Sequence, residues 1–260
     1  MKYFFKNIIL NKILRSSSLQ PLWEKLHSYS IVGMNFWGGA RFEESGELWI
    51  VKNVLKGKIN GVIFDIGANE GHYSLSLSNI IGERSKIYCF EPSKKTFEKL
   101  KRNVSHIDGI ILNNLGFGDK EQKLILYHTS ESTGLSSLYG NNPLTEFTEE
   151  EEINLSTITG FCNSNRISEI DFLKVDVEGH EYNVLLGATE MIRERRIKFI
   201  QFEMGECNIV SRTFFRDFYE LLKDNYIIYR VLPDGIREIK HYKTIHEIFA
   251  CINYLAVARK

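Results

Sequence analysis

Residues 64–71 read FDIGANEG, and this stretch decides the fold. An apolar run, residues 62–66 (VIFDI), ends at Gly67, and an apolar helical pattern begins at Gly71. Gly67 lets the backbone take a positive φ and approach a ligand closely, and Gly71 lets the helix start pack tightly. In open α/β sheets, ligands bind outside the carboxyl ends of the strands. The sequence therefore predicts a buried strand, a tight turn and a helix, with a ligand site at the turn.

Strand and helix patterns alternate along the rest of the chain. Further strands are predicted at residues 87–90, 110–112, 170–177, 197–202, 226–231 and 252–257, and helices at residues 96–104 (N-cap Ser93), 182–195 and 214–222. This alternation implies parallel βαβ units, and the two last strands, with no helix between them, indicate an antiparallel edge. We predict an α/β fold with a doubly wound, mostly parallel, Rossmann-like sheet.

The sheet is predicted to form one domain, residues 59–260, after an N-terminal cap or extension, residues 1–58. An insert at about residues 120–158 contains a strand at residues 123–128 and a long polar loop at residues 129–152.

The N-terminal residues 1–14 (MKYFFKNIILNKIL) place apolar side chains at helical spacing, interrupted by lysines. They predict a helix that packs on the domain or on the second subunit of a homodimer. A contact with a membrane surface through this helix is the alternative.

The overall composition limits partners and compartment. The 33 basic and 33 acidic side chains cancel, so no basic excess indicates a nucleic-acid partner. The four cysteines, Cys89, Cys162, Cys207 and Cys251, lack the paired spacing of zinc or redox motifs. We expect them to be small hydrophobic side chains in a reducing compartment, which predicts a cytoplasmic protein.

The side chains at the first turn favour one cofactor over another. A dinucleotide-binding G-x-G-x-x-G fingerprint requires glycine where Asn69 stands. Asp65 and Glu70 add negative charge, which suits the ammonium and sulfonium groups of S-adenosylmethionine better than phosphates. Glu91 ends the second strand and offers two acceptor oxygens to ribose hydroxyls. A glycine turn without any ligand is the alternative.

A second polar group follows the fourth predicted strand. Residues 171–188 read DFLKVDVEGHEYNVLLGA, so Lys174, Asp176, Glu178 and Glu181 crowd the end of an apolar strand and the turn after it. A core strand gains no stability from such charges, and we predict a functional site there. For Glu178 and Glu181 the alternative is solvated charge at a helix start.

Several of these blocks together resemble one known family. They are residues 62–74 (VIFDIGANEGHYS), 90–103 (FEPSKKTFEKLKRN), 112–119 (LNNLGFGD), 134–138 (GLSSL) and 170–188 (IDFLKVDVEGHEYNVLLGA). The combination resembles the FkbM-type S-adenosylmethionine-dependent methyltransferases. The resemblance covers about residues 62–203.

The resemblance implies a class I methyltransferase fold, S-adenosylmethionine as methyl donor, and O-methylation of a small-molecule or glycan acceptor such as a sugar or a secondary metabolite. The matching cofactor-binding positions are Asp65, Gly67, Asn69, Gly71 and Glu91, with Asn114 near the adenine; Glu70 joins them on its charge alone. Asp176 would face the transferable methyl group. The chain departs from the family at residues 157–159, where Thr-Ile-Thr replaces the frequent Thr-Leu-Asp.

The catalytic candidates are Asp176, Glu178 and His180, each able to act as a base toward a hydroxyl, and we favour Asp176 as base or orienting residue. No resident metal is predicted, although Asp176 and Glu203 occupy positions that hold magnesium in catechol O-methyltransferase-like enzymes. Two other functions stay open: a nicotinamide-dependent oxidoreductase, and a non-catalytic module that binds the cofactor. A stacking platform for a sugar is a further hypothesis, with the candidate side chains Trp23, Phe36, Trp37 and Phe42.

Overall fold

The structure, a computed structural model, describes residues 12–38, 42–82, 85–129, 136–140 and 145–260. Its centre is an eight-stranded sheet with strand order β10-β9-β11-β8-β7-β1-β2-β3. The strands are β1 Val62–Ile66, β2 Lys86–Phe90, β3 Ile110–Asn113, β7 Ile170–Val175, β8 Ile197–Met204, β9 Tyr226–Leu232, β10 Gly235–Glu238 and β11 Ile252–Ala258.

Five neighbouring strands, β3, β2, β1, β7 and β8, run parallel, whereas β11 pairs antiparallel with both β8 and β9. The predicted doubly wound sheet with an antiparallel edge is confirmed. The strand order reverses between β1 and β7, which is where such sheets open a crevice for a ligand.

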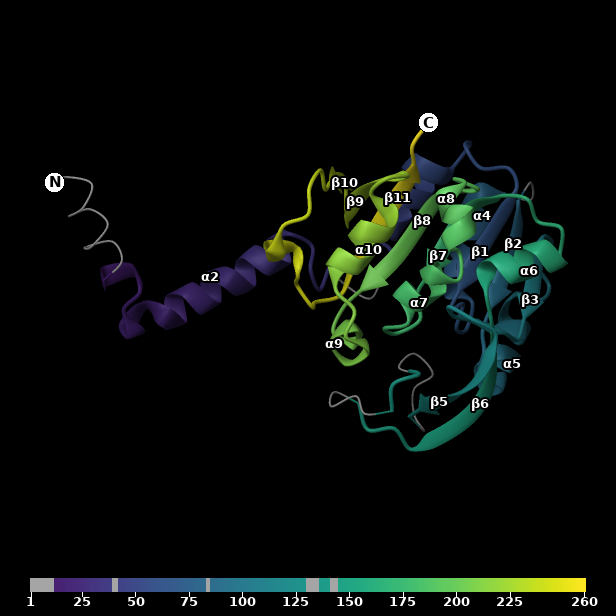
Figure 1. Cartoon of the computed structure of the whole chain (residues 1–260), viewed down its shortest axis with the longest axis horizontal. Helices are drawn as coiled ribbons and strands as arrows, with labels where there is room; N and C mark the ends of the chain where they lie inside the picture. Colours follow the sequence, from purple (N-terminus) through teal and green to yellow (C-terminus); the bar gives the residue numbers. More distant parts are fainter. Residues whose placement is uncertain (1–11, 39–41, 83–84, 130–135, 141–144) are drawn as a thin grey trace.

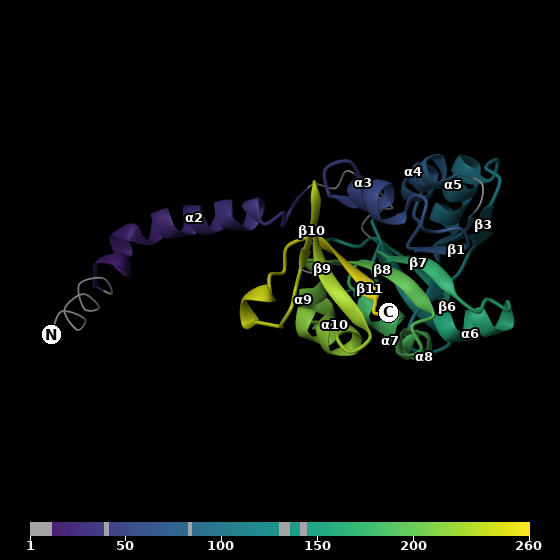
Figure 2. The same cartoon turned by 90° about the horizontal axis from the view of Figure 1, so that it is seen from above.

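Helices cover both faces of the sheet, as Figure 2 shows from above. On one side lie α3 Glu47–Ile50, α4 His72–Ile81 and α5 Lys94–Val104, and on the other lie α6 Ile158–Ser164, α7 Glu181–Leu186, α8 Thr189–Arg193 and α10 Phe215–Leu222. Alternate side chains of each strand enter the two cores: Ile63 and Phe172 enter one, and Phe64 and Leu173 enter the other. A short helix, α9 Cys207–Ser211, follows β8.

Local signals account for some helix ends. Ser93 caps α5 as predicted, because its side chain accepts a hydrogen bond from the Thr96 N–H. The prediction of one helix over residues 182–195 is wrong, since the chain forms α7 and α8 with a break at Gly187. A Cβ atom on Gly187 would lie 2.1 Å from the carbonyl oxygen of Gly118, so the break lies at a close contact between two backbones.

The insert forms a small second sheet of β4 Gly116–Phe117, β6 Glu149–Ser156 and β5 Gln122–His128. In Figure 1 it curves away below the main sheet. The predicted loop ends too late, because β6 already begins at Glu149. Glutamates have low strand propensity, which hid this strand, but Leu126, Ile153 and Leu155 form a buried cluster between β5 and β6.

The N-terminal part has two different roles. After the 3₁₀ turn η1 Ser17–Leu19, α2 Gln20–Gly33 projects away from the domain in both views (Figures 1 and 2). By contrast, α3 and the π-helical stretch η2 Val51–Leu55 pack into the core. No helix in the described ranges is long and apolar enough to cross a bilayer. The predicted contacts of residues 1–14 fall largely on residues 1–11, outside the described residues.

Candidate active site

A cavity of about 190 Å³ lies where the strand order reverses. It is reached from the carboxyl ends of three neighbouring strands, because Gly67 follows β1, Glu91 follows β2 and Asp176 follows β7. Three more predicted site residues line it, namely Asn69, Glu178 and His180. Its apolar wall was not predicted residue by residue and comprises Phe90, Leu115, Phe117, Leu126, Leu138, Ile153 and Leu155 among others.

The turn after β1 has the backbone geometry that its glycine predicts. Gly67 has φ 80° and its N–H donates to the carbonyl of Phe90 over 3.0 Å. A Cβ atom there would lie 1.7 Å from the carbonyl oxygen of Asp176. Gly67 therefore allows the turns after β1 and β7 to touch. Asn69 also has positive φ, 48°, and the buried oxygen of its side chain has no hydrogen-bond partner among the described residues.

Glu91 is a buried acceptor at the cavity wall. One carboxylate oxygen accepts the N–H of Asn69 at 3.1 Å, and the other accepts the N–H of Ser93 at 3.0 Å. Each oxygen keeps a second acceptor position, so two ribose hydroxyls can still be bound. Burial raises the pKa of Glu91 to about 7, against the effect of these two hydrogen bonds.

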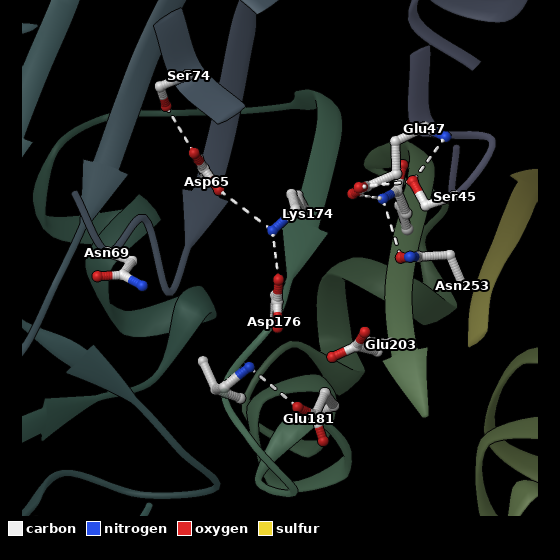
Figure 3. A network of polar contacts seen from close by, with 12 residues as sticks. Ser45, Glu47, Asp65, Asn69, Ser74, Lys174, Asp176, Glu181, Glu203 and Asn253 are labelled. Carbon is white, nitrogen blue, oxygen red and sulfur yellow. Dashed lines mark hydrogen bonds and ion pairs between the residues drawn. The ribbon is translucent and has the colours of Figure 1, made fainter. Parts of the chain in front are cut away.

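A line of three charged groups runs from β1 to β7 (Figure 3). The Lys174 ammonium lies 2.8 Å from Asp176 and 3.9 Å from Asp65, whose carboxylate also accepts from the Ser74 hydroxyl at 2.6 Å. Burial opposes the charge on Lys174, but Asp176, Asp65 and Glu47 outweigh it and raise its pKa. Asp65 is completely buried and does not line the cavity. Lys174 is thus the buried counter-charge of both Asp65 on β1 and Asp176 at the end of β7.

Asp176 also pairs with Glu203 at the end of β8. Burial opposes its ionisation, but the Lys174 charge and the hydrogen bonds from Lys174 and Glu203 hold its pKa below the ordinary value. For Glu203, burial and the nearby Asp176 raise the pKa well above its usual range, and its carboxyl contacts the Cys251 thiol at 2.6 Å. No group of three potential metal ligands gathers within the described residues.

Glu178 occupies a strained turn beside the cavity. Its φ is 52° and that of Gly179 is 101°, two consecutive left-handed residues. Its carboxyl accepts from the Cys207 thiol at 3.2 Å. Burial and the neighbouring Asp176 raise the pKa of Glu178 to about 8.

Glu181 fixes the conformation of this turn. One of its oxygens accepts the N–H groups of Val177 at 2.9 Å and Gly179 at 3.1 Å. Its side chain is 2% exposed, and burial raises its pKa to about 7. The alternative of solvated charge at a helix start is therefore wrong for Glu181, and Glu178 too is largely enclosed.

His180 is held in one orientation by the insert and by α7. Its Nδ1 lies 3.1 Å from the Tyr139 hydroxyl and 3.0 Å from the Asn183 amide nitrogen, which can only donate. This network assigns the proton of the neutral ring to Nε2, which is buried without a described hydrogen-bond partner. Burial lowers the pKa of His180 to about 4, so the ring is neutral at pH 7.

Four predicted cofactor residues lie outside the cavity wall. Asp65 belongs to the charged line, and Glu70 forms an ion pair with Lys99 at 2.8 Å. Gly71 packs α4 against α5, and the amide of Asn114 donates to the carbonyl groups of Glu91 and Pro92. Their roles toward the cofactor stay predictions, and the contacts seen are supporting ones.

The sugar-stacking hypothesis fails for two of its four aromatic residues. Phe36 is 1% exposed and belongs to the main core. Trp23 lies on α2, which projects away from the domain (Figure 1).

The strand order, the reversed edge strand and a cavity with an acidic residue after β2 define a class I methyltransferase fold. The model of the methyltransferase FkbM domain matches residues 65–226, well over half of the chain. The chain belongs to the FkbM methyltransferase family, which confirms the resemblance seen in its sequence. The domain is thereby assigned as an S-adenosylmethionine-dependent methyltransferase domain, and a nicotinamide-dependent oxidoreductase is not favoured.

Three curated relatives are about a quarter identical to this chain over the aligned residues. Hexuronic acid methyltransferase AglP of Haloferax volcanii is 25% identical over 167 residues, which are 62% of this chain and 64% of that protein. The 2-O-methyltransferase NoeI of Sinorhizobium fredii is 24% identical over 162 residues, 57% of this chain and 66% of that protein. Methyltransferase 1 of Beauveria bassiana is 28% identical over 143 residues, 48% and 57% of the two chains. The chain thus spans less than two thirds of each of these relatives.

Two solved structures resemble the fold at low identity. A SAM-dependent methyltransferase from Agrobacterium tumefaciens gives a TM-score of 0.48 at 11% identity, covering 85% of this chain and 64% of that chain. A SAM-dependent O-methyltransferase from Thermotoga maritima gives a TM-score of 0.44 at 12% identity, covering 88% and 70%.

The residues of the cavity fit S-adenosylmethionine. Glu91 would supply paired acceptors for ribose hydroxyls, and the unpartnered oxygen of Asn69 would supply an acceptor for an ammonium group. Phe90, Phe117 and Leu115 would supply an apolar surface for an adenine ring. Asp176, ionised at neutral pH, would supply negative charge for a cationic sulfonium.

Proposed function

We propose that this chain is an O-methyltransferase that transfers the methyl group of S-adenosylmethionine to a hydroxyl of a sugar or glycan. The observation that carries the proposal is one shared cavity at the β1–β7 reversal. This cavity contains Glu91, whose two carboxylate oxygens can accept hydrogen bonds from ribose hydroxyls. It also contains Glu178, a carboxyl whose pKa is close to neutral. The relative named as a hexuronic acid methyltransferase supports a carbohydrate acceptor, and the relative named as a 2-O-methyltransferase supports transfer to oxygen.

The wall residues divide the work of the reaction. When bound, S-adenosylmethionine supplies an electrophilic methyl group, so an acceptor hydroxyl needs orientation and a base. Glu178 is the base in this proposal, because a pKa of about 8 lets it hold the hydroxyl proton and still ionise near neutral pH. Asp176 is charged but has a lowered pKa, so it orients groups rather than accepting a proton. The Nε2–H of His180 is a free donor for the acceptor.

The charge of the wall constrains the acceptor. Among the described residues, neither lysine nor arginine lines the cavity, whereas Glu91, Asp176 and Glu178 do. An anionic acceptor would meet these carboxyls directly, whereas the Lys174 ammonium is buried and paired with Asp176 at 2.8 Å. We therefore expect an uncharged hydroxyl compound, such as a neutral hexose residue, to be methylated in preference to a uronic acid.

The test combines binding with turnover. Calorimetry should show binding of S-adenosylhomocysteine and none of NAD. S-adenosylhomocysteine should then accumulate when neutral oligosaccharides are supplied with the methyl donor. Binding of NAD alone would contradict the cofactor. Binding without turnover on any sugar in a broad panel would favour the non-catalytic module.

A further inference from the structure

A second cavity, of about 400 Å³, lies at the other end of the sheet. It is enclosed by the segment that follows α2, by β9, β10 and β11, and by the chain around the 3₁₀ turn η4 Thr244–His246. It shares no wall residue with the candidate active site, and all its wall residues lie outside residues 65–226. The methyltransferase domain common to the family therefore does not account for it.

Two arginines lie side by side in the wall of this cavity. Arg237 of β10 is directly paired with Arg230 of β9, so both side chains leave the same face of the sheet. Like charges in directly opposed positions destabilise a sheet. In the part of the chain that the structure describes, neither arginine forms an ion pair, and the buried Nε of Arg230 has no hydrogen-bond partner. Burial lowers the pKa of Arg230, and the charge of Arg237 lowers it further.

The nearby acids do not neutralise this pair. Glu238 also contributes to the cavity wall, but it follows Arg237 and is paired with Tyr229, so strand alternation directs its side chain to the face opposite that of the two arginines. Glu247 accepts the N–H groups of Phe215 and Arg216 at the start of α10, and the hydroxyl of Tyr242. Its carboxylate is thus committed to capping that helix.

Apart from Glu238 and His246, the remaining wall residues are apolar or aromatic. The Arg230 guanidinium lies 5.7 Å from the centre of the Phe36 ring, and Ile239, Ile248 and Tyr254 continue the surface. A cavity of this size is within the range of small-ligand sites, roughly 300–1,000 Å³. Guanidinium groups bind oxyanions through paired N–H donors.

We propose that this cavity binds an oxyanion group, such as a phosphate or a carboxylate, that is carried on an apolar body. The anion relieves the repulsion between Arg230 and Arg237 and accepts the unpartnered N–H of Arg230. The apolar body covers the isoleucines and the aromatic side chains. The site is independent of the proposed methyl transfer.

The experiment titrates the full chain with octyl phosphate, octanoate and inorganic phosphate at low salt, by calorimetry. Octyl phosphate should bind at least tenfold more tightly than inorganic phosphate, and octanoate shows whether a carboxylate serves equally. The test variant is Arg237→Gln, since Arg237 is exposed and the variant should fold. Its matched control is Arg102→Gln on α5, an exposed arginine that loses the same charge far from this cavity.

Arg237→Gln should weaken octyl phosphate binding at least tenfold, and Arg102→Gln should leave it unchanged. Without ligand, Arg237→Gln should also raise the melting temperature, because it removes a like-charge pair. S-adenosylhomocysteine affinity should be equal in all three proteins, which separates this site from the active site. Equal octyl phosphate affinity in Arg237→Gln and wild type, a lower melting temperature of that variant, or equally tight binding of inorganic phosphate would overturn the proposal.

Discussion

Replacing Glu178 with glutamine tests the proposed base directly. The amide keeps the shape of the side chain and can still accept from the Cys207 thiol, but it cannot take up a proton. The pKa of Glu178 is about 8, so about a tenth of the carboxyl is ionised at pH 7 and about nine tenths at pH 9. Because only the ionised form accepts a proton, wild-type turnover should rise about tenfold between these pH values.

Glu178→Gln should lower turnover by about 10²–10⁴-fold at pH 9 and remove this rise with pH. The assay is the initial rate of S-adenosylhomocysteine formation at saturating donor and acceptor, from pH 6 to 10. The matched control is Glu98→Gln, an exposed glutamate on α5, which should keep wild-type rates throughout. A Glu178→Gln enzyme that kept more than about a tenth of the wild-type rate, or the same acidic limb, would refute the assignment.

Three further substitutions test the cofactor turn and its neighbours. Gly67→Ala should destabilise the protein by about 2 kcal/mol more than Gly57→Ala in thermal melts, because both glycines have positive φ but only a Cβ atom at position 67 would clash with the carbonyl of Asp176. Equal losses of stability in the two variants would contradict this. Glu91→Ala should weaken S-adenosylhomocysteine binding by about 1.5–3 kcal/mol in calorimetry, and wild-type affinity should fall about tenfold from pH 8 to pH 6 as Glu91 protonates. A loss of only a few tenths of a kcal/mol in Glu91→Ala would place the ribose elsewhere. Asp176→Asn should lower turnover about 10²-fold while cofactor affinity stays within a few-fold of the wild-type value, and a chelator should not change wild-type turnover. Loss of activity with a chelator and its restoration by magnesium would favour the metal-assisted alternative.

The sheet was predictable because its strands are short apolar runs that end at informative residues. The run at residues 62–66 ends at Gly67, and the structure has β1 at Val62–Ile66. Periodicity alone failed where a contact distant in sequence decides the structure. The break between α7 and α8 depends on the close approach of the Gly118 backbone to Gly187, and the apolar periodicity of residues 182–195 does not predict it.

The small sheet of the insert could not be predicted for a different reason. Residues 149–152 are four glutamates, which look like a solvated loop. They form a strand because their neighbours Ile153 and Leu155 pack against Leu126, and because Lys123 pairs with Glu152 at 2.7 Å. Such support from a partner strand is not visible in the run itself.

The sequence argument assigned negative charge to the first turn, but the structure pairs the acids of that turn with lysines. Asp65 and Glu70 carry the negative charge of the FDIGANEG turn, yet Lys174 compensates Asp65 and Lys99 pairs with Glu70. A formal charge in a motif therefore says little about the charge that a ligand meets.

The carboxyls that do reach the cavity come from two strand ends: Glu91 follows β2, and Asp176 and Glu178 follow β7. Burial raises the pKa of Glu91 to about 7 and that of Glu178 to about 8, whereas the Lys174 ammonium keeps Asp176 ionised against the same burial. Near neutral pH, Asp176 is thus the one of the three that stays charged, while the other two exchange protons. A cationic donor meets one fixed negative charge, and an acceptor hydroxyl meets a carboxyl able to take its proton. Adding formal charges along the sequence could not separate these roles, because they depend on which acid the single lysine reaches.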